Sequence, residues 1–321
     1  MNENNENIGF IGLGKMGLPM AMNLLNSGYR VYGSDVNPAS ASELQKAGGN
    51  TGHFSNWVPA VQTIILMLPS STIVNHVIEE ILATYETMHS NQTERLTIID
   101  MSSSYPHDTK TNGEKLKLRK IDFMDAPVSG GIQKARSASL TIIAGGEEEV
   151  FKKCKRLLHS LGKQVFHIGP LGSGHLLKAL NNYLSATHLL SACEAVQLME
   201  RYGVQPEKGI EVFNHSTGRS GSTEYKFPSF ILNKRFDSGF SLELMKKDVE
   251  MAKHLFEDYG AETVLPRVVH QRFEEASQAL ESFADHTEIY RYVTSYLLKR
   301  GNSREENEEM VPSPTDIRSG L

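Results

Sequence analysis

Three glycines near the N-terminus have the spacing of a dinucleotide-binding loop. They lie in the run Gly12-Leu13-Gly14-Lys15-Met16-Gly17, which follows a β-branched apolar run and opens a helical pattern. In such a loop the first glycine makes a tight turn, the second lets the backbone approach a pyrophosphate, and the third lets helix and strand pack closely. Backbone N–H groups around Lys15 and Met16 are then expected to face the pyrophosphate at a helix N-terminus.

An acidic residue at the end of the next predicted strand indicates which dinucleotide is bound. Asp35 follows Gly17 at close to the separation of about 20 residues expected for the acid that binds the adenosine ribose. A carboxylate there accepts hydrogen bonds from ribose hydroxyls and repels a 2′-phosphate. No arginine follows in Val36-Asn37-Pro38, so the sequence favours NAD over NADP.

The elements that position this loop alternate through the first half of the chain. Short apolar runs alternate there with helical patterns, which is typical of a parallel sheet with crossover helices. The strands are predicted at residues 8–13, 29–34, 63–68, 96–100, 123–128, 139–144 and 165–168. The predicted fold class is α/β: an N-terminal Rossmann-type doubly wound parallel sheet followed by an all-helical C-terminal domain.

The pattern changes after residue 169. Apolar residues then recur at helical spacing, and helices are predicted at residues 172–202, 206–215, 242–259 and 266–281. We therefore expect an NAD-binding domain over residues 1–169 and a helical substrate and oligomerisation domain over residues 170–300. Residues 301–321 are rich in glutamate and proline and are expected to be disordered.

The composition excludes several other classes of protein. The chain has 321 residues and a formal net charge of −5, which does not suit a nucleic-acid binder. No apolar run approaches the roughly 18 residues of a membrane span, and the polar, acidic start does not resemble a signal or transit peptide. The two cysteines, Cys154 and Cys193, and the twelve histidines lack metal-ligand spacing. We therefore expect a cytoplasmic protein without a metal site or a membrane or nucleic-acid partner.

Four blocks of sequence resemble one family, and they occur in the family's order. Residues 10–23 closely resemble the N-terminal signature of the 3-hydroxyisobutyrate dehydrogenases, which are β-hydroxyacid dehydrogenases. Residues 125–131 resemble that family's substrate loop, residues 172–182 its catalytic helix and residues 247–252 its C-terminal cofactor-closing segment. The resemblance covers about residues 8–295. It implies an NAD-dependent oxidoreductase that interconverts a small anionic 3-hydroxy acid and its semialdehyde, and that forms a dimer or tetramer through the helical domain.

The resemblance also implies roles for individual residues. Lys178 resembles the catalytic lysine and Asn182 its helper, while Ser129, Gly130 and Gly131 resemble the loop that holds the substrate carboxylate. Four further residues match positions that contact the cofactor: Leu68, Pro69, Ser103 and Lys247.

The residue types suit this chemistry. Gly174, Lys178 and Asn182 are spaced by four, so they share one face of a helix. A lysine in a cleft can accept the alcohol proton during oxidation or donate one during reduction. Asn182 can hold the reacting oxygen or the lysine by hydrogen bonds. His175, beside this block, is expected to be a boundary or surface histidine, and Asp285-His286 is a weaker acid–base signal still.

Three departures from the family pattern stand out. Ser103 replaces the usual threonine and keeps its hydroxyl, and Ala138 replaces a usual glycine. Gly221 stands in a substrate-pocket segment where many members have an aromatic residue, which leaves the identity of the substrate open.

Several alternatives remain. Sulfolactaldehyde or tartronate semialdehyde reductases belong to the same family. Imine reductases share the architecture but often lack the lysine, so Lys178 argues against them, and a chromatin-associated relative would need an added reading module. A non-catalytic NAD-binding sensor is a different class, and a turnover assay distinguishes it.

Overall fold

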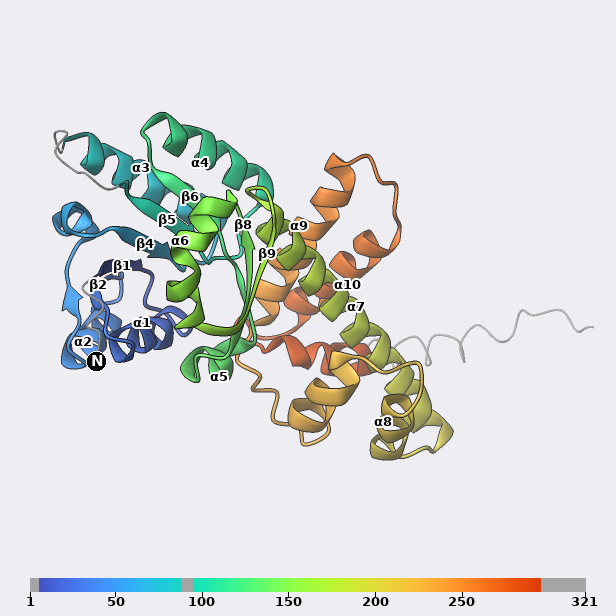
Figure 1. The fold of residues 1–321 in the computed structure, drawn as a ribbon. Helices are drawn as coiled ribbons and strands as arrows, with labels where there is room; N and C mark the ends of the chain where they lie inside the picture. The colour runs from blue at the N-terminus through green and yellow to red at the C-terminus, as the bar shows by residue number, and fades with distance from the viewer. Residues whose placement is uncertain (1–5, 88–94, 296–321) are drawn as a thin grey trace, which may run out of the picture. The chain divides into compact units, whose positions relative to one another are not determined.

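The computed structural model describes residues 6–87 and 95–295, and the chain divides into two compact units between Asn182 and Tyr183. The first unit contains the sheet and the second is helical (Figure 1). The predicted tail, residues 301–321, lies outside the described residues. The predicted boundary at residue 169 stays a prediction: the strands end at Gly169, but the first compact unit continues into the long helix that follows.

The first unit is built on one mixed sheet. Its strands are β1 (Asn7–Ile11), β2 (Arg30–Ser34), β3 (Asn50–Thr51), β4 (Thr63–Leu66), β5 (Thr97–Asp100), β6 (Asp122–Asp125), β7 (Val128–Ser129), β8 (Leu140–Gly145) and β9 (Gly162–Gly169). They lie in the order β3-β2-β1-β4-β5-β6-β8-β7, and β9 pairs with β8. The pairs from β3 to β6 are parallel, as predicted, whereas β8 is antiparallel to β6 and β7. The connection between β7 and β8, residues 130–139, is shorter than the dozen or more residues that a parallel crossover takes, so β8 reverses direction.

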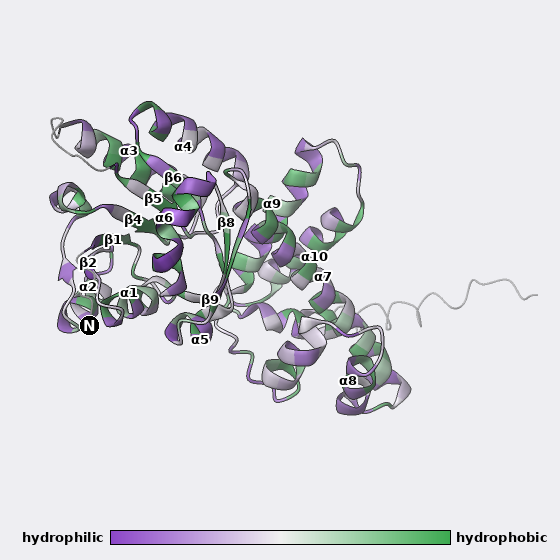
Figure 2. Cartoon of the chain, in the orientation of Figure 1, coloured by the Kyte–Doolittle hydropathy of each residue, from purple (hydrophilic) through white to green (hydrophobic). Residues whose placement is uncertain are grey.

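Helices cover both faces of this sheet, which confirms the doubly wound fold. They are α1 (Gly17–Asn26), α2 (Pro38–Lys46), α3 (Ser71–Thr87), α4 (Pro106–Leu118), α5 (Gly131–Arg136) and α6 (Glu148–His159). Alternate strand residues point to opposite faces. Phe10 of β1 packs in one core with residues of α1, α2, α5 and α6, whereas its neighbour Ile11 packs in another with residues of α3 and α4. Figure 2 shows the apolar colouring of the strands between mixed or hydrophilic helices.

The second unit is helical. It contains most of α7 (Ser173–Tyr202), then α8 (Pro206–Asn214), the π-helix η3 (Ser222–Ile231), α9 (Leu242–Asp258) and α10 (Leu265–Ala279). Phe227 and Phe273 are fully buried at the centre of its core. The helices α7 to α10 begin and end within about two residues of the predicted ranges, whereas η4 (His286–Glu288) and the helical residues 289–295 were not predicted. No helix was predicted for η3, because a proline inside a helical pattern is typical of a break, and η3 contains Pro228. None of the helices in the described ranges combines the length and apolar character that a membrane span requires.

Ala138 adopts a backbone conformation that favours glycine. Its φ angle is 49°, in the left-handed region that residues with a Cβ atom enter at a cost of roughly 1–2 kcal/mol. This explains why glycine is usual at the position in the family that the sequence resembles.

Candidate functional site

The predicted cofactor residues of the first unit gather at one edge of its sheet. The register places Ser34, Ile11, Leu66, Asp100 and Asp125 in one row across five neighbouring strands. Each is the last residue of a parallel strand, so the loops that follow all leave from the carboxyl edge. Ligands of open α/β sheets bind at this edge.

The space around the three glycines of the loop fits a dinucleotide site. A Cβ atom on Gly12 would lie 2.3 Å from the Met67 carbonyl oxygen, and one on Gly17 would lie 1.9 Å from that of Gly12, so packing alone excludes side chains there. A Cβ atom on Gly14 would meet nothing within 4 Å. The protein therefore does not itself require glycine at this exposed position, whereas a pyrophosphate approaching the backbone does.

Asp35 is tied to the same loop. Its Oδ2 accepts a hydrogen bond from the Leu13 N–H at 2.5 Å, and its Oδ1 accepts one from the Asn37 N–H at 2.7 Å. The carboxylate is therefore fixed beside the glycine loop at the end of β2. From this position the carboxylate is predicted to accept hydrogen bonds from the ribose hydroxyls.

Asp35 is expected to determine whether the enzyme prefers NADH or NADPH. We expect wild-type kcat/KM to be at least about tenfold higher with NADH than with NADPH, because the Asp35 carboxylate repels a 2′-phosphate. Asp35→Asn keeps an acceptor for Leu13 N–H but removes the charge, so the ratio should move toward NADPH. Steady-state kinetics with both cofactors measure this. A wild-type enzyme that prefers NADPH would refute the role given to Asp35.

Leu68, Pro69 and Ser103 lie in the next two loops of the row. The loops are joined because the Leu68 N–H donates to Ser102 Oγ at 2.9 Å. The Asp100 carboxylate in turn accepts from the Ser102 N–H and from Ser104 Oγ, at 3.0 and 2.7 Å. Ser103, half-buried between these two serines, is thus held in a fixed loop. Its contact with the cofactor stays a prediction.

Asp125, for which no individual role was predicted, is a structural centre of the site. It is fully buried, and its carboxylate accepts hydrogen bonds from the Gly172 and His175 N–H groups, both at 2.7 Å. These donors belong to the start of α7, where a carboxylate satisfies otherwise unpaired N–H groups and complements the helix dipole. Asp125 therefore connects the start of the segment that carries Ser129 to the start of the helix that carries Lys178.

The expectation that His175 lies at a boundary or the surface is wrong. The residue is 1% exposed, its Nε2 lies 3.1 Å from the Ser102 carbonyl oxygen and its Nδ1 lies 2.7 Å from Thr109 Oγ1. A carbonyl oxygen only accepts, so Nε2 carries a proton. His175 fastens α7 to the loop after β5 and to α4, which is a structural role.

The predicted proton-transfer residues project from α7. Lys178 is half-buried and Asn182 is buried, one turn apart on one face. The Asn182 Oδ1 accepts from Asn181 Nδ2 at 3.1 Å. In the predicted substrate loop, Ser129 ends β7, and Gly130 and Gly131 have φ angles of 134° and 70°. The predicted roles of these residues stay predictions.

Lys247, predicted to meet the cofactor, belongs to the second unit. It lies on α9, half-buried, and its Nζ is 3.2 Å from the Asp248 carboxylate. Among the residues of the described ranges, no group of histidine, cysteine, aspartate and glutamate side chains is arranged to hold a metal ion.

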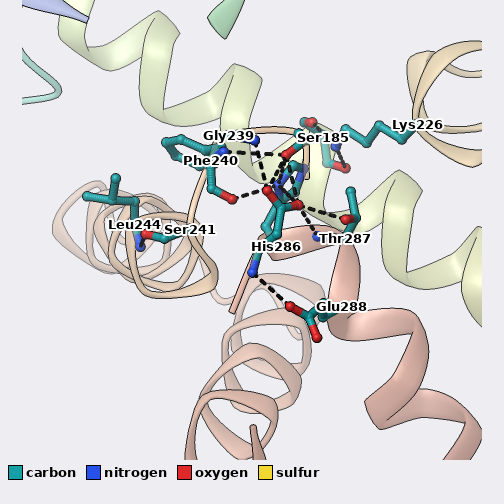
Figure 3. Close-up of polar contacts among 11 residues, drawn as sticks. Ser185, Lys226, Gly239, Phe240, Ser241, Leu244, His286, Thr287 and Glu288 are labelled. Atoms are coloured by element: carbon teal, nitrogen blue, oxygen red, sulfur yellow. Dashed lines mark hydrogen bonds and ion pairs between the residues drawn. The ribbon is translucent and has the colours of Figure 1, made fainter. Parts of the chain in front are cut away.

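The second unit also holds a buried polar cluster, shown in Figure 3. Asp285 accepts hydrogen bonds from Ser238 Oγ, the Gly239 N–H and Thr287 Oγ1 at 2.7–2.9 Å. Burial opposes ionisation of this carboxyl, but hydrogen bonds from His286 and Thr287 outweigh burial and hold its pKa at about 2. Burial also lowers the pKa of His286. Asp285-His286 is thus a buried structural anchor.

A half-buried lysine, Lys226, lies beside this cluster and was not singled out from the sequence. Lys226 Nζ donates to Ser185 Oγ at 2.8 Å, and Cys193 and Asp285 lie near enough to act on its charge. Burial lowers the pKa of Lys226 to about 8, and those two residues offset the effect only in part.

The charged form of Lys226 is expected to lower the free energy of unfolding. Its pKa lies below that of an exposed lysine, so the folded state loses the proton first, and stability should rise as pH increases from about 8 to 10.5. Lys226→Met should raise the free energy of unfolding at pH 7 by about 1–3 kcal/mol and remove that pH dependence. Urea denaturation at pH 7 and 9.5 measures this, with Lys246→Met, a half-buried lysine paired with Glu243 at 2.7 Å, as control. A lower stability of Lys226→Met at both pH values would contradict the prediction.

Known proteins share both units. Residues 7–169 match the family pattern of the NAD-binding domain of 6-phosphogluconate dehydrogenase. Residues 172–293 match that of the NAD-binding region of NADP-dependent 3-hydroxyisobutyrate dehydrogenase. The 3-hydroxyisobutyrate dehydrogenase of Rattus norvegicus is 31% identical over 293 residues, which cover 89% of this chain and 86% of the rat protein. The chain belongs to the 3-hydroxyisobutyrate dehydrogenase family.

Two further relatives agree with this membership. The 2-(hydroxymethyl)glutarate dehydrogenase of Eubacterium barkeri is 36% identical over 246 residues, covering 76% of this chain and 80% of that protein. The structure of the 3-hydroxyisobutyrate dehydrogenase of Mycobacterium tuberculosis with L-serine superposes with a TM-score of 0.83 at 26% identity, covering 90% of this chain and 99% of that one. This member of the family is therefore an NAD-dependent oxidoreductase that acts on the CH–OH group of a hydroxy acid.

Proposed function

We propose that the protein interconverts a 2-substituted 3-hydroxypropanoate and its semialdehyde. The molecules named with its relatives, 3-hydroxyisobutyrate, 2-(hydroxymethyl)glutarate and L-serine, share the group HOCH2–CH(X)–COO⁻. They differ only in X, which is methyl, carboxyethyl or ammonium. One observation carries the proposal: Asp125 joins the segment of the predicted carboxylate-binding loop to the helix of the predicted proton-transfer pair.

Each part of the shared group has a counterpart in the chain. Ser129, Gly130 and Gly131 offer a hydroxyl and backbone N–H donors to the carboxylate. Lys178 Nζ accepts the hydroxyl proton as the C–O bond becomes a carbonyl, and Asn182 orients the reacting oxygen. Bound NAD supplies the chemistry of hydride acceptance. The alcohol thus loses one hydride and one proton, and reduction runs the same transfers in reverse.

We also propose a homo-oligomer, a dimer or a tetramer. In support, the second unit exposes large apolar side chains at the turn between α9 and α10, where Tyr259, Val264 and Leu265 are 51–75% exposed. Large exposed apolar surfaces mark sites of association.

A reducing compartment such as the cytoplasm suits the two free, buried cysteines. Burial raises the pKa of Cys154 to about 12 and keeps its thiol protonated.

An NAD-reduction screen tests the proposal. The panel contains the three acids above, tested with NAD, and lactate as a 2-hydroxy acid control. Tartronate semialdehyde and sulfolactaldehyde are tested in the reverse direction with NADH. We expect turnover of at least one acid with the shared group and none of lactate. Turnover of lactate alone, or of nothing in the panel, would overturn the proposal.

A further inference from the structure

The second unit contains a pocket lined by none of the residues to which the proposed reaction is assigned. It has a volume of about 360 Å³ and lies between α7, the end of α8 and residues 217–223; we call it the α7–α8 pocket. This volume falls at the lower end of the range for small-molecule sites, about 300–1,000 Å³. The α7 residues that line it include two small ones, Ala192 and Ala195.

The pocket lining contains basic and hydroxyl side chains. It includes Arg219, His188 and four hydroxyl side chains, and none of the described residues that line the pocket is acidic. Phe213 and the two alanines supply apolar walls. Basic and hydroxyl donors together with apolar side chains suit a ligand with a carboxylate on an aliphatic chain.

The loop that presents Arg219 is fixed before any ligand arrives. The Ser220 N–H donates to Thr223 Oγ1 at 2.9 Å, and the Thr223 N–H donates back to Ser220 Oγ at 3.3 Å. Asn214 Nδ2 of α8 donates to the Thr223 carbonyl oxygen at 3.1 Å. A preorganised loop lowers the entropy cost of binding.

Arg219 is available to an incoming anion. Its side chain is 63% exposed and lies 3.6 Å from the carboxylate of Glu224, which is itself 51% exposed. An exposed ion pair of this kind contributes little, so a ligand carboxylate can replace it. Next to this arginine in the loop, a Cβ atom on Gly221 would meet nothing within 4 Å, which leaves open space beside it.

We propose that the α7–α8 pocket binds the carboxylate of a short aliphatic acid, with Arg219 as its counter-ion. The ligand is separate from the substrate, so this proposal does not rest on the proposed function.

Calorimetry on the full chain with NADH tests binding, with glutarate as the probe and its uncharged diamide as control. We expect Arg219→Gln to weaken glutarate binding at least about tenfold and Ala195→Leu, which fills the pocket, to do the same. Arg235→Gln is the matched control, because Arg235 is also 63% exposed and paired with a carboxylate, Asp237. No glutarate binding at millimolar concentration, an equal loss in both arginine variants, or diamide binding as tight as glutarate would overturn the proposal.

Kinetics test whether the pocket ligand is separate from the substrate. Arg219→Gln should leave KM and kcat unchanged for 2-(hydroxymethyl)glutarate and for 3-hydroxyisobutyrate, although glutarate binding is lost. A KM for 2-(hydroxymethyl)glutarate raised at least about tenfold would overturn a separate ligand. An enzyme that turns over neither acid refutes the proposed function, and the calorimetry still decides the pocket.

Discussion

Replacing Lys178 by alanine is expected to lower kcat about 10²–10⁴-fold, the usual contribution of general acid–base catalysis. Lys178 is half-buried on α7, one turn from Asn182, where its Nζ is proposed to accept the alcohol proton. Lys178→Arg should be nearly as poor, because a guanidinium does not release its proton at a workable pH. The wild-type oxidation rate should rise with pH as the lysine deprotonates, and Lys178→Ala should lose that dependence.

Steady-state kinetics measure this result, and NADH titration serves as the folding control, since the cofactor is expected to bind mainly at the sheet edge. Lys155→Ala, which removes an exposed lysine of α6, should leave kcat unchanged. A Lys178→Ala enzyme within about threefold of wild type would show that the proton goes elsewhere, because general catalysis contributes far more.

Methylating the substrate carboxylate is expected to lower kcat/KM by about 10²–10⁴-fold. The ester removes the charge that two hydrogen bonds from the Ser129–Gly131 loop are proposed to stabilise, and each such bond is worth roughly 1.5–3 kcal/mol. Ser129→Ala should raise KM for the acid about tenfold or more and have little effect on the ester. Ser137→Ala, an exposed serine at the end of α5, is the control. Equal kcat/KM values for acid and ester would contradict the carboxylate-binding role of the loop.

The sheet edge could be predicted from the sequence because its signals are local. A glycine loop, an acid at the next strand end and apolar runs of strand length each depend on a few neighbouring residues. The register then confirmed that the strands ending at Ile11, Leu66 and Asp100 lie side by side. The antiparallel β8 was not foreseen, because pairing direction depends on the length and path of a connection.

The buried polar residues could not be predicted, because burial depends on distant segments. His175 was expected near the surface, yet its partners, Ser102 and Thr109, lie 73 and 66 residues away in the chain. Lys226 looked like any other lysine, and its low pKa arises from burial against α7 and the segment around Asp285. The role of Asp125 was missed for the same reason, since its two backbone donors lie about 50 residues further on.

Deuterium transfer tests the proposed reaction most directly. The substrate is a 2-substituted 3-hydroxypropanoate with deuterium at both hydrogen positions of the carbon that bears the hydroxyl. It is incubated with NAD and the wild-type enzyme, and the reduced cofactor is examined by mass spectrometry and NMR. The expected result is one deuterium per reduced cofactor, on C4 of the nicotinamide ring, with loss of the label from the acid at the same rate and a Lys178→Ala rate lower by about 10²–10⁴. Reduced cofactor without deuterium, or no reduction with any acid of this class, would contradict hydride transfer from the CH–OH carbon.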